Sequence, residues 1–210
     1  MGQDKIADPV KLPFGKTIYQ KKGLGISSDS QLLYEAVLAA DPAGNKALEL
    51  GSGNGIVSIM LAAARKDWQI TGLEIQPELV ELSQKNAAIC GLDCQFIEAD
   101  LRLFSASQPY EIIFANPPYF ARGKGRISPQ EARAISRHEL LCNLAEVLAC
   151  IRRNLAATGK AWLIYPQSRL SEIMEKSKKV DLIIAERKIL KQQDKIIVLL
   201  QHSTEKSKKE

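Results

Sequence analysis

Apolar positions along the chain follow two alternating periods. Short apolar runs, typical of buried parallel strands, are separated by longer segments in which apolar residues recur on one face of a helix. The predicted strands cover residues 46–50, 69–74, 94–99, 110–115 and 160–165. The predicted helices cover residues 54–65, 77–90, 139–155 and 168–177, and a closing strand pair covers residues 182–189 and 196–201. This order predicts an α/β fold with a mainly parallel sheet and helices on both faces.

The segment before the first predicted strand carries one further helix signal. Ser28, Asp29 and Ser30 are all residue types that cap helices, and apolar residues recur at helical spacing over residues 32–40. One interpretation is an ordinary loop that ends in an N-cap. The other is a helix that covers one end of a bound molecule and presents Asp29 to it. We therefore divide the chain into an N-terminal segment with a capping helix (1–40), an α/β domain (41–202) and a basic tail (203–210).

Composition agrees with one compact domain. A chain of 210 residues that is 45% hydrophobic can bury a full core. We find no apolar run of membrane-spanning length and no leader-like start, so we expect a cytoplasmic, monomeric protein without a membrane partner. The four cysteines lack the paired spacing of a zinc site, which predicts reduced packing residues and no metal. A net charge of +5 is compatible with a polyanionic partner but does not identify one.

A glycine-rich turn follows the first strand of the α/β domain. Gly51, Gly53 and Gly55 are spaced G-x-G-x-G, and Ile56 stands where a dinucleotide-binding turn has its third glycine or alanine. The Gly-Lys-Ser/Thr of a phosphate-binding loop is also absent from the sequence of this turn. Such a turn lets a ligand approach the backbone closely, beside the amino end of the next helix. Pyrophosphate binding is therefore disfavoured, and a carboxylate fits at this turn as well as a phosphate does.

Two acidic residues end the next two strands. Glu74 comes about twenty residues after the glycine-rich turn, where a carboxylate can accept both hydroxyls of a ribose. Asp100 follows the strand predicted at residues 94–99. Because the carboxyl ends of parallel strands meet at one edge of a sheet, the turn, Glu74 and Asp100 together predict a nucleoside pocket.

Asn116, Pro117, Pro118 and Tyr119 follow the apolar run 110–115. Prolines have no backbone N–H, so this loop offers carbonyl oxygens and few donors, which suits an incoming NH2 group. The side-chain oxygen of Asn116 and the carbonyl of Pro117 can each accept one of its hydrogens, and Tyr119 can stack on the planar group that carries the amine. Taken alone, the motif also fits an ordinary turn after a strand. Together with the glycine-rich turn, it predicts methylation of an amino group.

Cations are concentrated directly after this motif. They are Arg122, Lys124, Arg126, Arg133 and Arg137. They fit either a solvated surface loop or a surface that holds the phosphates around a looped-out base. His138 fits a substrate-positioning role or a structural one.

Several segments together resemble one known family, the bacterial tRNA1(Val) adenine-N6-methyltransferases. The resemblance rests on residues 28–30, the turn 49–55, Leu73-Glu-Ile-Gln-Pro-Glu78, Asn116-Pro-Pro-Tyr-Phe120 and Ser136-Arg-His-Glu139, and it covers nearly the whole chain. It implies a Rossmann-like class I methyltransferase whose mainly parallel seven-stranded sheet has a C-terminal antiparallel strand. It also implies S-adenosyl-L-methionine as cofactor and adenosine 37 of a valine tRNA as substrate.

The same resemblance implies roles for individual residues. Asn116, Pro117 and Tyr119 are implied in amine binding and stacking, with Pro118 and Phe120 beside them. The expected cofactor contacts are Glu49, Gly51, Gly53, Gly55, Glu74, Ile75, Asp100, Leu101, Asn116 and Asp29.

Three alternatives remain open at this point. A glutamine amide in a translation release factor needs the same amine geometry, although enzymes of that class carry an additional N-terminal helical domain. Adenine or guanine amines in another RNA or in DNA are also chemically possible, but a separate domain that reads duplex DNA is not evident. A noncatalytic RNA-binding module that retains the fold would be recognised by failure to bind the cofactor.

Overall fold

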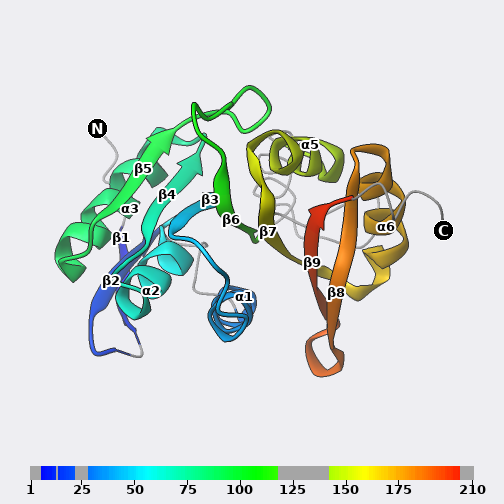
Figure 1. Cartoon of the computed structure of the whole chain (residues 1–210). Helices are drawn as coiled ribbons and strands as arrows, with labels where there is room; N and C mark the ends of the chain where they lie inside the picture. Colours follow the sequence, from blue (N-terminus) through cyan, green and yellow to red (C-terminus); the bar gives the residue numbers. More distant parts are fainter. Residues whose placement is uncertain (1–5, 13, 22–27, 118–141, 204–210) are drawn as a thin grey trace.

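The computed structural model describes residues 6–12, 14–21, 28–117 and 142–203. Its main sheet has seven strands in the order β5-β4-β3-β6-β7-β9-β8 (Figure 1). The first four in sequence are β3 (Lys46–Leu50), β4 (Gln69–Glu74), β5 (Cys94–Glu98) and β6 (Tyr110–Ala115), and these pair in parallel. Next come β7 (Leu155–Pro166), β8 (Leu182–Leu190) and β9 (Lys195–His202), with β9 antiparallel to both β7 and β8. The predicted fold class is confirmed.

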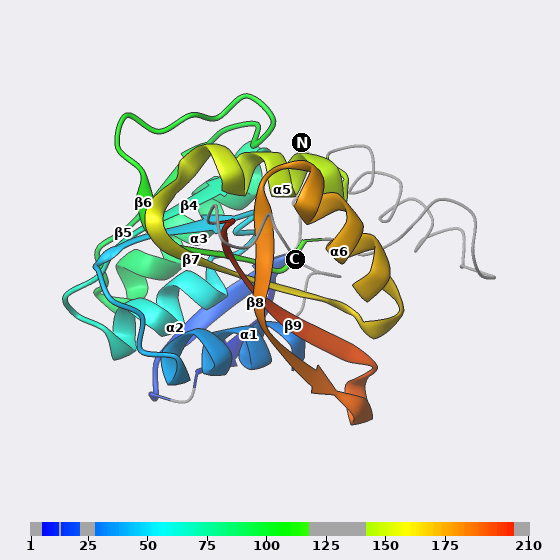
Figure 2. The same ribbon diagram turned by 45° about the vertical axis from the view of Figure 1, so that its right-hand side comes forward.

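Helices cover both faces of this sheet. One face carries α1 (Ser28–Ala39), α2 (Ile56–Ala64) and α3 (Pro77–Cys90), and the other carries α5 (Leu144–Asn154) and α6 (Leu170–Lys179) (Figures 1 and 2). Two 3-10 turns, η1 (Gln167–Arg169) and η2 (Lys191–Gln193), connect β7 to α6 and β8 to β9.

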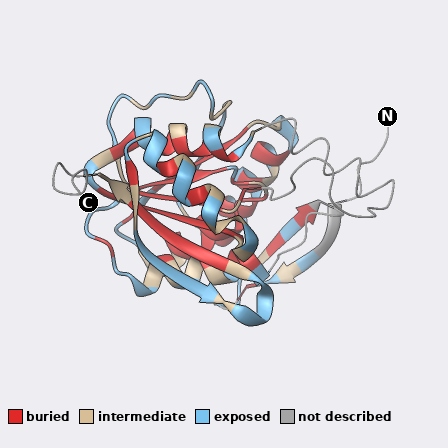
Figure 3. Cartoon of the chain, turned by 90° about the vertical axis from the view of Figure 1, so that its right-hand side faces the viewer, coloured by how far each residue is buried: buried red, intermediate tan, exposed pale blue. Residues whose placement is uncertain are grey.

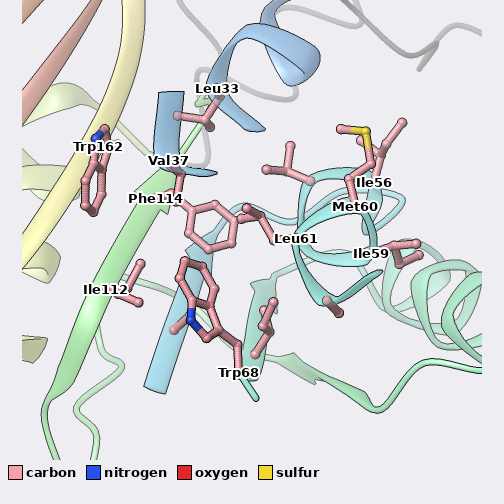
Figure 4. Packing of buried hydrophobic residues seen from close by; sticks show 14 of the residues in the cluster. Leu33, Val37, Ile56, Ile59, Met60, Leu61, Trp68, Ile112, Phe114 and Trp162 are labelled. Atoms are coloured by element: carbon pink, nitrogen blue, oxygen red, sulfur yellow. The ribbon is translucent and has the colours of Figure 1, made fainter. Parts of the chain in front are cut away.

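Strand alternation produces two separate cores. On β6, Ile112 and Phe114 pack with α1 and α2, whereas Ile113 and Ala115 pack with α5 and α6. Figure 4 shows the first of these clusters, with Phe114 between Val37 of α1 and Leu61 of α2. Burial on both faces explains why these strands are continuous apolar runs in the sequence.

The boundary between α5 and β7 differs from the sequence prediction of a helix over 139–155. The helix begins only at Leu144, because Asn143 and Glu146 form a reciprocal capping box. It ends at Asn154, and Leu155, predicted as its last residue, is extended and starts β7. Apolar periodicity could not place this boundary, because Leu155 is buried whether it continues the helix or starts the strand.

The N-terminal segment contains a β-hairpin that the sequence analysis did not predict. Strands β1 (Ile6–Lys11) and β2 (Thr17–Lys21) pair antiparallel and form a two-stranded sheet of their own. Prolines within and after β1 and its short length conceal the strand pattern. Figure 3 shows both buried and exposed residues on the hairpin, and β2 buries Ile18 and Gln20 against the body of the molecule.

A buried asparagine fastens the hairpin to the body. The side chain of Asn86 on α3 accepts from Tyr19 N at 2.8 Å and donates to Tyr19 O at 2.9 Å, as a neighbouring strand would. Its amide also donates to the carbonyl of Asn54 in the glycine-rich turn at 3.0 Å. Asn86 is fully buried, so these hydrogen bonds satisfy a side chain that would otherwise destabilise the fold.

Candidate active site

The register of the sheet brings the predicted site residues to one edge. Leu50, the last residue of β3, pairs with Leu73 of β4 on one side and with Ala115 of β6 on the other. The glycine-rich turn, Glu74 and Asn116 therefore leave three neighbouring strands at the same level. The strand order reverses between β3 and β6, which is where ligands bind in open α/β sheets.

Only two of the three glycines in the turn border open space. Gly51, Gly53 and Gly55 have φ values of 70°, 56° and 79°, which side chains disfavour. A Cβ atom built on Gly51 or Gly53 would meet no atom within 4 Å. One built on Gly55 would lie 2.7 Å from Cζ of Phe96. The first two glycines thus form an open cradle, while Gly55 allows α2 to pack closely on β5.

Backbone amides fix the carboxylate of Glu74. Its Oε2 accepts from Gly53 N at 3.0 Å, and its Oε1 accepts from Ile75 N and Gln76 N, each at 3.0 Å. Glu74 is only 7% exposed. The carboxylate is therefore already oriented beside the cradle, which is the arrangement that a ligand with vicinal hydroxyls requires.

Glu49 lies behind the turn rather than on its open side. It is buried, and its Oε2 accepts from the backbone N and the hydroxyl of Ser58 on α2, at 3.2 and 2.5 Å. Burial raises the pKa of Glu49 to about 8, although the bonds from Ser58 partly oppose this. The observed contacts anchor β3 to α2, and direct cofactor contact by Glu49 stays a prediction.

Asp100 carries a partner that the sequence analysis missed. Arg102 donates through Nε to both carboxylate oxygens at 2.9 Å and through Nη2 to Oδ2 at 2.5 Å. Hydrogen bonds from Arg102 lower the pKa of Asp100 below its ordinary value. Arg153 of α5 in turn donates to the carbonyls of Leu101 and Phe104, so the segment after β5 is hydrogen-bonded to α5.

The first turn of α1 reaches the residue that follows β6. Asn116 Nδ2 lies 3.4 Å from Ser30 Oγ, which directs that nitrogen toward α1 and the amide oxygen away from Ser30. Beside it, Asp29 Oδ2 forms an ion pair of 2.8 Å with Lys195 Nζ at the start of β9. Pro117, which follows Asn116, is buried. The role of Asp29 toward a cofactor stays a prediction, but its carboxylate already has a protein partner.

The remaining predicted substrate contacts lie outside the described residues. They are Pro118, Tyr119, Phe120, Arg122, Lys124, Arg126, Arg133, Arg137 and His138. Their roles stay predictions.

Four contributors escaped the sequence analysis: Ser30, Asn86, Arg102 and Lys195. Arg102 had a local signal, since an arginine two residues after an aspartate can pair with it. Ser30 was recognised only as a capping residue. Asn86 and Lys195 bind residues 32 and 166 positions away in the sequence, and nothing in the local pattern indicates this.

The cysteines are free thiols, as predicted. Burial raises the pKa of Cys94 to about 12 and that of Cys150 to about 11, so neither is a ready nucleophile. Within the described ranges, His, Cys, Asp and Glu side chains do not gather in threes that could hold a metal ion. None of the described helices combines the length and apolarity needed to cross a bilayer.

Comparison with known proteins identifies the family of this chain. The family described as "Methyltransferase small domain" matches residues 17–135. A tRNA1(Val) (adenine(37)-N6)-methyltransferase from Aeromonas hydrophila is 32% identical over 140 residues, which cover 65% of this chain and 58% of that protein. A release factor glutamine methyltransferase from Deinococcus radiodurans is 34% identical over 88 residues, which cover 42% of this chain and 31% of that protein. The match to the Aeromonas protein thus leaves more than a third of that relative's length uncovered.

Solved structures share the fold. A ribosomal protein L11 methylase from Lactobacillus delbrueckii superposes with a TM-score of 0.64 at 15% identity, over 86% of this chain and 81% of that one. At this identity the similarity concerns the arrangement of strands and helices.

Proposed function

Because the chain belongs to the methyltransferase small domain family, we propose that it methylates the exocyclic amine of adenine in RNA, using S-adenosyl-L-methionine. The specific substrate that we propose is N6 of adenosine 37 in a valine tRNA. Relatives with that activity in their names support this choice, including proteins from Aeromonas hydrophila and Porphyromonas gingivalis. The observation that carries the proposal is the alignment of the open glycine turn with Asn116 across β3 and β6.

The described residues fit the proposed cofactor. Gly51 and Gly53 leave room for its amino-acid portion at the backbone, and Glu74 presents a fixed carboxylate to its ribose. Asp100 would have to share its carboxylate between Arg102 and the cofactor base. When bound, the cofactor supplies a methyl group on a positively charged sulfur, which is a strong electrophile.

Asn116 is the proposed catalytic residue among those described. Its amide oxygen would accept one N–H of the target amine, and the carbonyl of Pro117 would accept the other. These bonds hold the amine in place and direct its lone pair toward the methyl carbon. The amine proton leaves to solvent after the nitrogen has gained its positive charge, so a strong base is not required.

Transfer of labelled methyl from S-adenosyl-L-methionine into total RNA tests the proposal, with RNA taken from cells that lack this protein. We expect label in the tRNA fraction, released as N6-methyladenosine on nucleoside digestion. Asn116→Ala should abolish most of the transfer while calorimetric affinity for S-adenosyl-L-methionine stays within about threefold of the native value. Equal loss of cofactor affinity and turnover in this variant would contradict the proposed role of Asn116.

A second candidate is methylation of a glutamine amide in a translation release factor. The 34% identity to the Deinococcus radiodurans protein favours it, since it is similar to the 32% identity to the Aeromonas hydrophila protein. The match to the Deinococcus protein covers a shorter part of this chain. Added release factor in the same assay distinguishes the two. Label in the protein and none in RNA would replace the adenine proposal with this one.

A further inference from the structure

We infer that the β1–β2 hairpin is a docking surface for the phosphate backbone and unpaired bases of the substrate RNA. The inference rests on the proposed function, because it takes RNA to be the substrate. It concerns binding of the RNA body, away from the reacting amine.

The two faces of the hairpin differ in chemistry. Ile18 and Gln20 are 0% and 8% exposed and face the body of the protein. The intervening Tyr19 is 37% exposed and therefore points to the opposite side. Lys11 pairs with Thr17, which lies on the same side of β2 as Tyr19, so a lysine and a tyrosine share the outer face.

The turn of the hairpin continues this surface. Phe14 is 39% exposed, and Lys16 beside it is exposed as well. Residues 6–21 include three lysines and one aspartate, so this short segment is basic. Exposed aromatic rings interleaved with lysines are the combination that binds unpaired nucleic acid, since rings stack on bases and cations neutralise phosphates.

The hairpin lies close enough to the candidate active site for one RNA molecule to contact both. A single side chain, Asn86, bridges the backbone of Tyr19 and the carbonyl of Asn54 in the glycine-rich turn. At its other end, the hairpin is seven residues from Ser28, a separation of at most about 25 Å. Ser28 begins the helix that contacts Asn116.

Exposed lysines also occur elsewhere in the described part of the chain, and some of them form no ion pair with a described residue. The test therefore needs a matched control. Lys178 and Lys188 are exposed on α6 and β8, at the opposite end of the main sheet (Figure 1). Reversing their charge changes the net charge of the protein by the same amount as reversing Lys11 and Lys16.

The test compares Lys11→Glu/Lys16→Glu with Lys178→Glu/Lys188→Glu in tRNA binding, measured by fluorescence anisotropy at several salt concentrations. We expect the hairpin variant to bind at least tenfold more weakly at 100 mM salt and to reduce the salt slope by about two. Tyr19→Ala should weaken binding by about tenfold through lost stacking, with little change in the salt slope. The control pair should change affinity by less than threefold.

Methylation assays then locate the effect. A single adenosine monophosphate has no flanking nucleotides that could lie on the hairpin, so the native protein and the hairpin variants should methylate it equally. With full-length tRNA, the hairpin variants should raise KM. Equal losses on both substrates, or equal losses in the control pair, would overturn the inference.

The outcomes also separate this inference from the proposed function. If the native protein methylates tRNA and the hairpin variants bind tRNA normally, the docking surface is refuted and the proposed activity stands. Native protein that neither binds nor methylates RNA would overturn both.

Discussion

Replacing Glu74 by glutamine tests how the cofactor pocket is organised. Glu74 accepts at Oε1 from two backbone amides and from the side-chain amide of Gln76, and at Oε2 from the backbone amide of Gly53. A glutamine has only one acceptor oxygen, which would best occupy the Oε1 position. Its NH2 group would then face the N–H of Gly53, where two donors meet without an acceptor between them.

The expected losses follow from these contacts. Misplacing one donor beside Gly53 should lower the free energy of unfolding by about 1–2 kcal/mol, because the site is part-buried. Cofactor binding should lose one hydrogen bond to a charged group, worth about 1.5–3 kcal/mol. That corresponds to a Kd increased by roughly 10- to 150-fold.

Calorimetric titration of the variant with S-adenosyl-L-methionine measures the second loss, and urea unfolding measures the first. Glu81→Gln is the matched control, since it makes the same chemical change at an exposed position on α3. A Glu74→Gln protein that binds the cofactor within twofold of the native protein would refute the assignment of Glu74 to the ribose.

Three further changes test the surrounding structure. Gly55→Ala places a Cβ 2.7 Å from Phe96 Cζ at a φ of 79°, and urea unfolding should show a loss of about 3 kcal/mol; an unchanged midpoint would contradict the packing role. Burial raises the pKa of Glu49 from 4.5 to about 8, so its stabilising effect is complete below pH 4.5 and is lost as pH rises to 8. The free energy of unfolding of the native protein should therefore fall between pH 4.5 and 8 by a few kcal/mol more than that of Glu49→Gln. If the free energies of the two proteins change in parallel with pH, Glu49 is ionised in the folded protein. Asp29→Asn and Lys195→Met should each cost about 3 kcal/mol because the pair is largely buried, while the double variant should lose less than the sum; strict additivity in this cycle would mean that the ion pair contributes no coupling.

The central parallel strands β3, β4 and β6 could be predicted closely because most of their residues are buried, whereas β7, predicted from residue 160, begins at Leu155. The bounds predicted for β3, β4 and β6 match the structure, and that for β5 differs by one residue. Polar residues at strand ends then indicated the site, since parallel strands bring such residues to one edge.

What the sequence could not predict depends on contacts between distant segments. Strand β2 buries only alternate residues, and its outer edge is satisfied by the side chain of Asn86 rather than by another strand. The ion pair between Asp29 and Lys195 joins α1 to β9, so neither residue alone indicates its partner. The spacing grouped Gly55 with Gly51 and Gly53 as a cofactor contact. In the structure, Phe96 lies so close to Gly55 that a side chain at this position would clash with it.

The side chain of Asn86 links cofactor binding at the glycine-rich turn to RNA binding at the β1–β2 hairpin. A ligand that favours one position of the Asn54 carbonyl also favours one position of the β2 backbone, because the same amide donates to both. Thermodynamic linkage makes this effect reciprocal. If the bound cofactor raises the affinity for RNA through this side chain, bound RNA raises the affinity for the cofactor by the same factor. A buried residue that touches neither ligand would thereby let each substrate change the affinity for the other by the same factor, whichever of the two binds first.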